Sequence, residues 1–159
     1  MKLRDFIFQG LLAASYVVLT LVSAGLSYGP IQFRVSEVLL ILVFFRPKHA
    51  IGIVLGTFIA NVLGSPYGLD WIVGTLATLV ALVLMIKLAS WRWLALLMPT
   101  LSNGLLIGWL IWFSTNQQVP FLPATVTVAF GEFVVTFILG SLILKWMDGN
   151  NALKEILCQ

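Results

Sequence analysis

Turn-forming and polar residues divide this chain into six apolar segments. They cover approximately residues 6–27, 35–45, 50–63, 70–88, 93–113 and 124–146. The first holds about 22 residues, enough to cross the ~30 Å hydrocarbon core of a bilayer as a helix. The second and third are too short to cross upright, so we expect tilted or protein-buried pieces there. Because every backbone polar group in hydrocarbon needs an internal partner, all six segments are predicted to be helices.

Composition supports this pattern and sets the class of protein. Hydrophobic residues make up 60% of the 159 positions and charged residues only 9%, against about 25% charged in soluble domains. This excludes a soluble monomer, and the length predicts one membrane domain over residues 1–159. We read the first segment as a retained span, since a signal peptide has a shorter apolar core. The one cysteine, Cys158, cannot form an internal disulfide and is expected to be a bystander thiol.

The placement of basic residues predicts the orientation. With six crossings, one side of the membrane holds every Lys and Arg except Arg34: Lys2, Arg4, Arg46, Lys48, Lys87, Arg92, Lys145 and Lys154. Under the positive-inside rule that side is cytoplasmic, and both termini lie there. The loops at 28–34, 64–69 and 114–123 then face outward. The basic residues lie between apolar segments and form no run of the kind that binds nucleic acid.

Four charged residues fall at membrane depth or at its outer edge: Arg34, Glu37, Asp70 and Glu132. Arg34, Glu37 and Asp70 each also have a structural interpretation, whereas Glu132 is harder to explain in that way. Arg34 and Glu37 are three residues apart and could form a local salt bridge, and Asp70 could cap the helix that it opens. Glu132 lies about nine residues into the sixth segment, or ~13 Å deep. A carboxylate at that depth must face protein or water, which favours a functional role.

Two amides and several aromatic residues accompany these charges. Asn61 and Asn103 lie within apolar segments, where amides either join helices or bind ligands. Tyr28, Phe33, Tyr67 and Trp71 lie in or beside the outward loops, where they could stack on a ligand. One base and three acids give a net charge of −2 if all ionise, which would suit a cationic or donor-rich ligand.

Small residues at every fourth position predict close helix packing. Gly52, Gly56 and Ala60 form one such series, and Gly104 and Gly108 form another. We expect these to pack inside the bundle. For Gly10 and Ala14 in the first segment, a surface for a partner protein is an alternative.

Several catalytic signatures are missing. The chain has no G-x-x-x-x-G-K-[ST] loop for ATP, no H-E-x-x-H motif and no G-x-S-x-G elbow. Its one histidine, His49, cannot build a His-rich metal site and is predicted to be solvated in a basic loop. We therefore expect no catalytic residues, no metal and no cofactor.

Taken in order, the motifs resemble those of a known family. These are Tyr28-Gly-Pro-Ile-Gln-Phe-Arg-Val-Ser-Glu37, Gly56…Ala60-Asn61, Asp70…Gly74-Thr75, Asn103-Gly104 and Gly131-Glu132. They resemble the QueT family, substrate-binding (S) components of energy-coupling-factor (ECF) transporters assigned to queuosine precursors. The resemblance covers the whole chain, and the stretch from Gln32 to Glu37 is its most specific part.

The resemblance implies an all-α, six-helix S-component bundle in a bacterial cell membrane, with its site near the outer surface. It implies a deazaguanine ligand, such as the aminomethyl form, which carries a cationic amine. It also implies a transmembrane coupling protein and two ATPases as partners. In the family the first helix docks on the coupling protein through Ala-x-x-x-Ala, whereas here only Gly10 and Ala14 give a small-x-x-x-small pair.

The resulting hypothesis is a membrane subunit that binds a queuosine precursor. Glu37, Asp70 and Glu132 would accept ligand N–H groups, Asn61 and Asn103 would read a heterocycle edge, and Arg34 would orient Glu37 or meet a ligand carbonyl. The alternatives are an S component for another vitamin-like heterocycle, a small channel or structural membrane protein, and an intramembrane enzyme.

Overall fold

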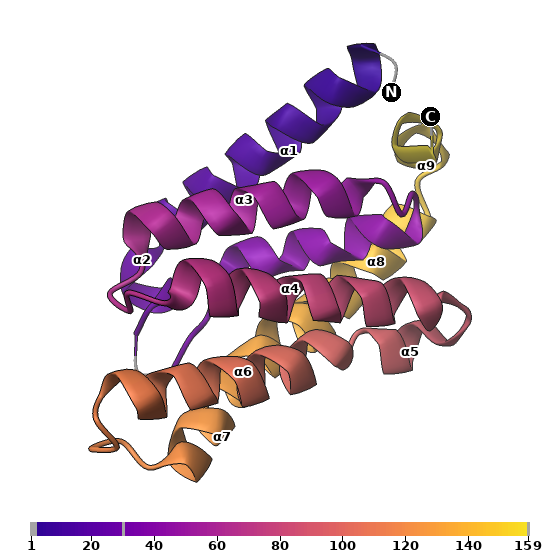
Figure 1. The fold of residues 1–159 in the computed structure, drawn as a ribbon. Coiled ribbons are helices and arrows are strands. Elements are labelled where there is room, and N and C mark those ends of the chain that lie inside the picture. Colours follow the sequence, from indigo (N-terminus) through magenta and orange to yellow (C-terminus); the bar gives the residue numbers. More distant parts are fainter. Residues whose placement is uncertain (1–2, 30, 159) are drawn as a thin grey trace.

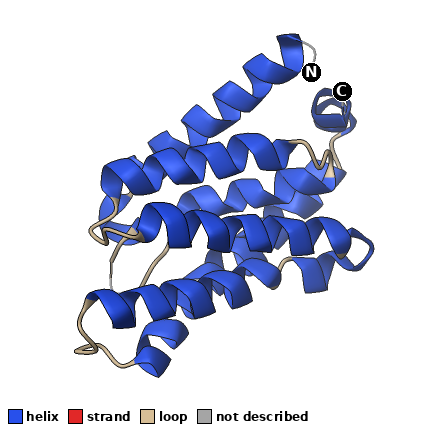
Figure 2. Ribbon diagram, viewed as in Figure 1, coloured by secondary structure: helices blue, strands red, loops and turns tan. Residues whose placement is uncertain are grey.

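The structure of this chain is a computed structural model that describes residues 3–29 and 31–158. Lys2 and Pro30, which entered the predictions above, lie outside the described residues, as do the side chains of Lys154 and Cys158. All regular structure in the described ranges is helical (Figure 2), as the sequence predicts. The elements in chain order are α1 (Leu3–Val22), α2 (Ala24–Ser27), η1 (Val35–Phe44), α3 (His49–Gly64), α4 (Asp70–Lys87), η2 (Ala89–Trp91), α5 (Arg92–Ala95), α6 (Met98–Ser114), α7 (Phe121–Glu132), η3 (Phe133–Leu139), α8 (Gly140–Asp148) and α9 (Asn151–Cys158).

The apolar elements run back and forth between two ends of a bundle (Figure 1). One end carries both chain termini and the turns that precede α3 and follow α4, and we call it the terminal end. The opposite end carries the loops after α2, α3 and α6, and we call it the loop end. At the terminal end, Arg46 donates a 2.8 Å hydrogen bond to Asp5, which joins the start of α1 to the turn before α3. The two termini therefore lie at the same end of the bundle.

Several helices are long and apolar enough to cross a membrane. They are α1, α4 and the continuous stretch Phe121–Asp148, and a fourth span results if the bent pair Ala89–Ala95 and Met98–Ser114 counts as one. The segments η1 and α3 are shorter apolar helices, as the sequence predicted for the second and third segments. The chain is thus a multi-pass membrane protein.

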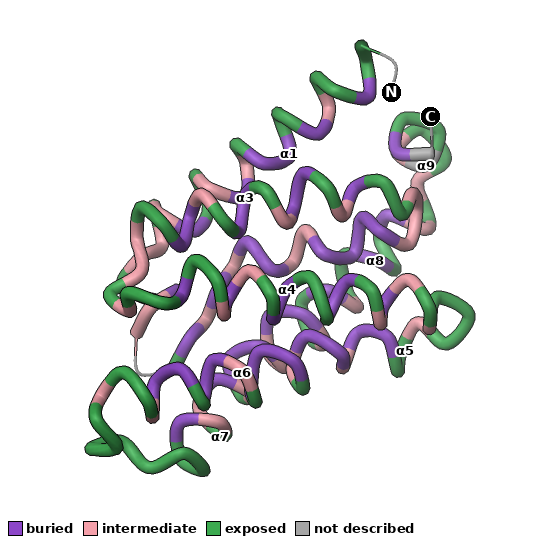
Figure 3. Tube along the Cα trace, viewed as in Figure 1, coloured by how far each residue is buried: buried purple, intermediate pink, exposed green. Residues whose placement is uncertain are grey.

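The second segment, η1, is a 3₁₀ helix of 10 residues. Such helices rise about 2.0 Å per residue, so η1 reaches ~20 Å where an α-helix of equal length reaches ~15 Å. Runs beyond three or four residues are uncommon. Both faces of η1 are covered, and its residues Leu40, Ile41 and Val43 are almost fully buried. The short second segment therefore lies inside the bundle, where packing supports an unusual backbone (Figure 3).

Two further irregularities divide the fifth and sixth segments. The fifth bends by 51° between α5 and α6, and Pro99, at the start of α6, explains the break because proline cannot continue a preceding helical hydrogen-bond ladder. The sixth contains a π-helical stretch, η3, which begins directly after Glu132. π-helical turns are rare and occur often at functional sites.

The predicted small-residue packing is confirmed for the third and fifth segments. A Cβ on Gly56 would lie 2.8 Å from Tyr16 Cβ and 2.9 Å from the Ala13 carbonyl oxygen, so α1 lies directly against α3. Gly104 and Gly108 likewise face Ala129 and Thr125 on α7. Glycine is needed at Gly56 because the neighbouring helix backbone occupies the space of a side chain.

The prediction of a solvated His49 is wrong. His49 opens α3 and is 2% exposed. Its Nε2 lies 3.1 Å from the carbonyl oxygen of Leu157, and its Nδ1 lies 3.3 Å from Gln9 Nε2. Beyond α8 the chain forms α9, and the contact of His49 with Leu157 packs that helix against the terminal end. The ring is buried because α1 and α9 cover it, a tertiary effect with no local signal.

Candidate functional site

Six polar side chains from five different apolar segments lie together in the interior, and we call them the polar cluster: Arg34, Glu37, Asn61, Asp70, Asn103 and Glu132. Each is 3% exposed or less. Arg34 is close enough to Glu37, Asp70 and Glu132 to interact electrostatically with all three. The structure therefore brings together the whole charged set that the sequence singled out, along with both amides.

The ion pair in this cluster joins Arg34 to Asp70, with 3.8 Å between Nη2 and Oδ2. A local salt bridge between Arg34 and Glu37 was one interpretation that the sequence left open, and the ion pair of Arg34 is with Asp70 instead. Arg34 precedes η1 and its backbone is not helical, so the helical spacing that would align the two side chains does not apply. The capping role that the sequence left open for Asp70 is not observed, because α4 begins without a side-chain cap and the Asp70 carboxylate pairs with Arg34.

Glu37 is fully buried and held by two hydroxyl donors. The Tyr16 phenol donates to Glu37 Oε1, and Thr78 Oγ1 donates to the same oxygen at 3.3 Å. Neither Tyr16 nor Thr78 is among the site residues predicted from the sequence. Tyr16 is the one tyrosine that lies in mid-helix, and a buried phenol needs a hydrogen-bond partner. That signal could have identified it, whereas Thr78 resembles any threonine in a membrane helix.

The two amides occupy different parts of the cluster. Asn61 donates from Nδ2 to the backbone oxygen of Asp70 at 3.2 Å, which ties α3 to the start of α4. Gly74 makes this approach possible, since a Cβ there would lie 2.6 Å from Asn61 Nδ2. Asn103 lies beside both Glu37 and Glu132. Those two carboxylates are close enough to repel each other, and the amide lies next to both.

Several buried donors and acceptors of the polar cluster have no hydrogen-bond partner among the described residues. The buried atoms without a hydrogen-bond partner there include Arg34 Nε and Nη2, Glu37 Oε2, Asn61 Oδ1, Asp70 Oδ1, Asn103 Nδ2 and Glu132 Oε2. Leaving one buried polar group unpaired costs about 1–3 kcal/mol. The seven atoms of this cluster include both donors and acceptors, so the cluster has unused capacity for hydrogen bonds.

The four aromatic residues predicted for the site divide into two groups. Tyr28 lies under the Arg34 guanidinium, 5.3 Å from ring centroid to Cζ, and donates to the Ala60 carbonyl oxygen at 2.9 Å. Tyr67 is half-buried near Asp70. Burial raises the pKa of its phenol, and the negative charge of Asp70 raises that pKa further. These two residues border the cluster at the loop end.

The other two aromatic residues lie farther from the charges. Phe33 is half-buried and packs edge-on against Phe130, with ring centroids 6.2 Å apart. Trp71 is 43% exposed and packs against Phe58 on the outer surface of α3 and α4. The structure does not bring Trp71 into the polar cluster.

The predicted partner-docking residues lie on the surface. Gly10 and Ala14 are exposed on α1, and a Cβ on Gly10 would meet no atom within 4 Å. The buried positions of α1 are Asp5, Gln9, Leu12, Ala13, Tyr16 and Thr20. The first helix thus packs on α3 through one face and presents Gly10 and Ala14 on another.

No metal site emerges from the part of the chain that the structure describes. Those residues contain no group of three or more His, Cys, Asp or Glu side chains that could hold an ion. The acids of the polar cluster are separated by a guanidinium and two amides, an arrangement suited to an organic ligand with N–H groups.

Comparison with known proteins agrees with the family resemblance that the motifs indicated. The model of the QueT transporter family matches residues 6–149. The chain is also 36% identical to the queuosine precursor transporter QueT of Lactococcus lactis subsp. cremoris (strain MG1363), in an alignment covering 86% of this chain and 88% of that protein. No solved structure matches the chain. The chain therefore belongs to the QueT transporter family.

Proposed function

We propose that this protein is the substrate-binding subunit of an ECF-type uptake transporter and that it binds a queuosine precursor in the polar cluster. The observation that carries the proposal is the set of buried, unpaired donors and acceptors contributed by five apolar segments. A structural role alone would leave their desolvation uncompensated. The name of the Lactococcus lactis relative supports the choice of ligand class.

The chemistry of a deazaguanine matches the available groups. Its ring N–H and exocyclic amino groups are donors, and its carbonyl is an acceptor. Glu37 Oε2 and Glu132 Oε2 are acceptors without partners, and Arg34 supplies N–H donors. Asn103 can donate and Asn61 can accept, as amides do at the edges of bases. An aminomethyl substituent would place a cation beside carboxylates, where Coulomb attraction favours it.

The proposed topology has six membrane helices with both termini in the cytoplasm and the loop end outside. The antiparallel course of the elements and the concentration of basic residues at the terminal end support it. The ligand would then enter from the loop end. Because the cluster is closed in this structure, entry requires the Tyr28 ring to move away from the Arg34 guanidinium.

Uphill uptake needs energy that ligand binding does not supply. The chain has no phosphate-binding loop for ATP, so we propose that a transmembrane coupling protein and two ATPases provide it. The face of α1 that carries Gly10 and Ala14 is the proposed docking surface. Small residues let a second helix approach closely, and the apolar side chains of Phe6, Leu11 and Val18 are exposed around them.

Calorimetry on the purified protein tests the ligand. We expect a deazaguanine with an aminomethyl group to bind with micromolar or tighter affinity and one-to-one stoichiometry. Guanine would separate recognition of the ring from recognition of the amine. Failure of every deazaguanine, together with tight binding of another vitamin-like heterocycle, would overturn the substrate assignment but keep the S-component function. Absence of saturable binding by any such ligand would overturn both.

A further inference from the structure

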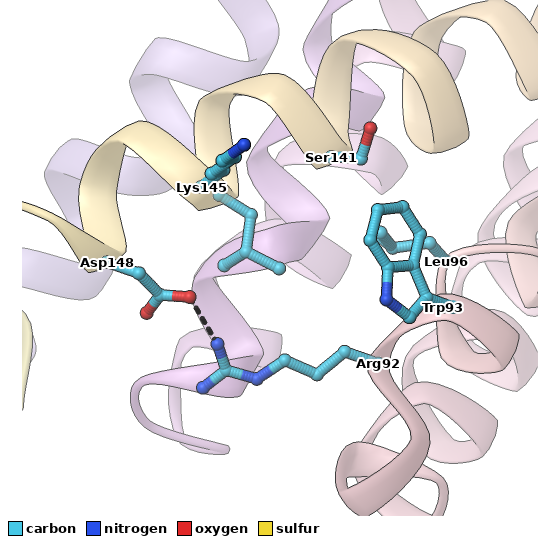
Figure 4. A pocket seen from close by; sticks show the side chains of 7 residues that line it. Arg92, Trp93, Leu96, Ser141, Lys145 and Asp148 are labelled. Atoms are coloured by element: carbon cyan, nitrogen blue, oxygen red, sulfur yellow. Dashed lines mark hydrogen bonds and ion pairs between the residues drawn. The ribbon is translucent and has the colours of Figure 1, made fainter.

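A pocket lies at the terminal end of the bundle, whereas the loops that border the polar cluster lie at the loop end. It is formed by the corner at η2 and α5 and by α8, and its volume is about 220 Å³. We call it the corner cavity. Figure 4 shows the Arg92–Asp148 pair at one side of it and Trp93, Leu96 and Ser141 at the other. None of its lining residues belongs to the polar cluster.

The charge of the corner cavity is positive. Arg92 donates from Nη1 to Asp148 Oδ2, and its guanidinium lies 5.8 Å from the centre of the Phe44 ring. This fixes Arg92 between a carboxylate and an aromatic ring, while a guanidinium has further N–H donors. Lys145 has no carboxylate of the described chain within ion-pair distance. Two bases and one acid give a net charge of +1 at the mouth of an apolar pocket.

The surroundings of the cavity are those of a membrane interface. Trp91, Trp93 and Trp146 are 71%, 68% and 65% exposed at this end of the bundle. Exposed indoles gather where headgroups meet hydrocarbon. Leu96 and Leu144 form the apolar wall of the cavity, and Leu142 and Ile143 continue an exposed apolar surface along α8. A ligand in this cavity would contact basic side chains and apolar side chains at the same time.

We propose that the corner cavity binds the headgroup of an anionic phospholipid. The phosphate would lie at Lys145 and the free N–H groups of Arg92, and the first methylene groups of a lipid chain would lie against Trp93 and Leu144. A soluble anion would gain nothing from the apolar wall. Basic pockets between membrane helices on the cytoplasmic side bind acidic lipids for the same reasons.

Native mass spectrometry of the full-length protein, with phosphatidylglycerol and phosphatidylcholine added in detergent, tests this site. We expect phosphatidylglycerol to be retained preferentially and Lys145→Gln to weaken its binding about fivefold. Lys145→Arg should restore it. Lys48→Gln removes one charge from an exposed lysine at the same end, outside the cavity, and should leave binding unchanged.

Three outcomes would overturn the proposal. They are equal retention of the two lipids, equal loss in Lys48→Gln and Lys145→Gln, and full displacement of phosphatidylglycerol by millimolar inorganic phosphate. The last outcome would identify a free-anion site instead. Thermal unfolding of each variant, with and without phosphatidylglycerol, separates loss of binding from loss of fold. A variant that is folded but has lost the site should unfold at the same midpoint with and without the lipid.

Discussion

The phenol of Tyr16 in α1 donates a hydrogen bond to Oε1 of Glu37 in the 3₁₀ segment that follows. Tyr16 is fully buried, and it also packs against Gly56 of α3. One residue therefore holds an acid of the polar cluster and also lies at a close contact between α1 and α3. The opposite surface of the same helix presents Gly10 and Ala14. The first helix thus links the proposed ligand site with the proposed docking surface.

Replacing Tyr16 by Phe should weaken both stability and ligand binding. The change keeps the ring but removes a donor from the buried Glu37 carboxylate, where a hydrogen bond to a charged group contributes about 1.5–3 kcal/mol. We expect a lower thermal midpoint without ligand and weaker affinity for a deazaguanine by calorimetry. Unchanged values for both quantities would show that Glu37 does not depend on the phenol.

The Arg34–Asp70 pair should behave as a coupled unit. Removing one partner leaves a buried charge uncompensated, so Arg34→Gln and Asp70→Asn should each lower the free energy of unfolding by about 3 kcal/mol. The double variant should lose clearly less than the sum. Denaturant unfolding in mixed micelles measures all three. Strict additivity would contradict an ion pair between these residues.

Much of this architecture follows from the sequence. The apolar segments, the interior packing of Gly52, Gly56, Gly104 and Gly108, and the membership of the polar cluster rest on local composition and spacing. The pairing of the charged side chains does not follow from the sequence. The three-residue spacing allowed a pair between Arg34 and Glu37, but the backbone at Arg34 is not helical, and its ion-pair partner comes from α4. Which buried groups pair is decided by helix packing.

The same limit explains the other differences. A 3₁₀ segment, a π-helical stretch and a bend have nearly the same hydrophobic pattern as a straight α-helix, so η1 and η3 are invisible in the sequence. His49 has polar and basic neighbours in the chain, yet two distant helices bury it. The mid-helix position of Tyr16 indicates that its phenol needs a partner, but only helix packing determines that this partner is Glu37.

Two glycine substitutions should have opposite outcomes. Gly56→Ala places a methyl group within 3 Å of Tyr16 and the Ala13 backbone, and we expect a loss of about 1–3 kcal/mol in the free energy of unfolding from overpacking. Gly10→Ala adds the same group in open space and should cost nothing. Thermal unfolding of the two variants makes the comparison. Similar destabilisation by both would contradict the orientation of α1.

Enlarging the exposed face of α1 should separate binding from transport. We expect Ala14→Leu to retain ligand affinity, because Ala14 points away from the polar cluster, but to reduce copurification with the coupling protein and uptake in cells. Leu79→Ala, at an exposed position on α4, is the surface control. Normal assembly of Ala14→Leu would place the docking surface elsewhere.

Cysteine labelling tests the proposed orientation. In a Cys158→Ser background, Gln118→Cys lies in the exposed loop after α6, and Ser90→Cys lies in the exposed corner after α4. A membrane-impermeant maleimide applied to whole cells should label Gln118→Cys and leave Ser90→Cys unlabelled until the membrane is opened. The reverse result would invert the topology, and labelling of both from outside would contradict an odd number of crossings between them.

The central claim is that the polar cluster binds the ligand, and Glu132→Gln tests it most directly. The variant keeps the shape of the side chain and removes its charge. Calorimetry with an aminomethyl deazaguanine should therefore show an affinity reduced about 10- to 100-fold. The thermal midpoint of the ligand-free variant should not be lower than that of the unmodified protein. Glu155→Gln, an exposed glutamate on α9, is the matched control and should bind like the unmodified protein. Saturable binding that Glu132→Gln leaves unchanged would contradict the site.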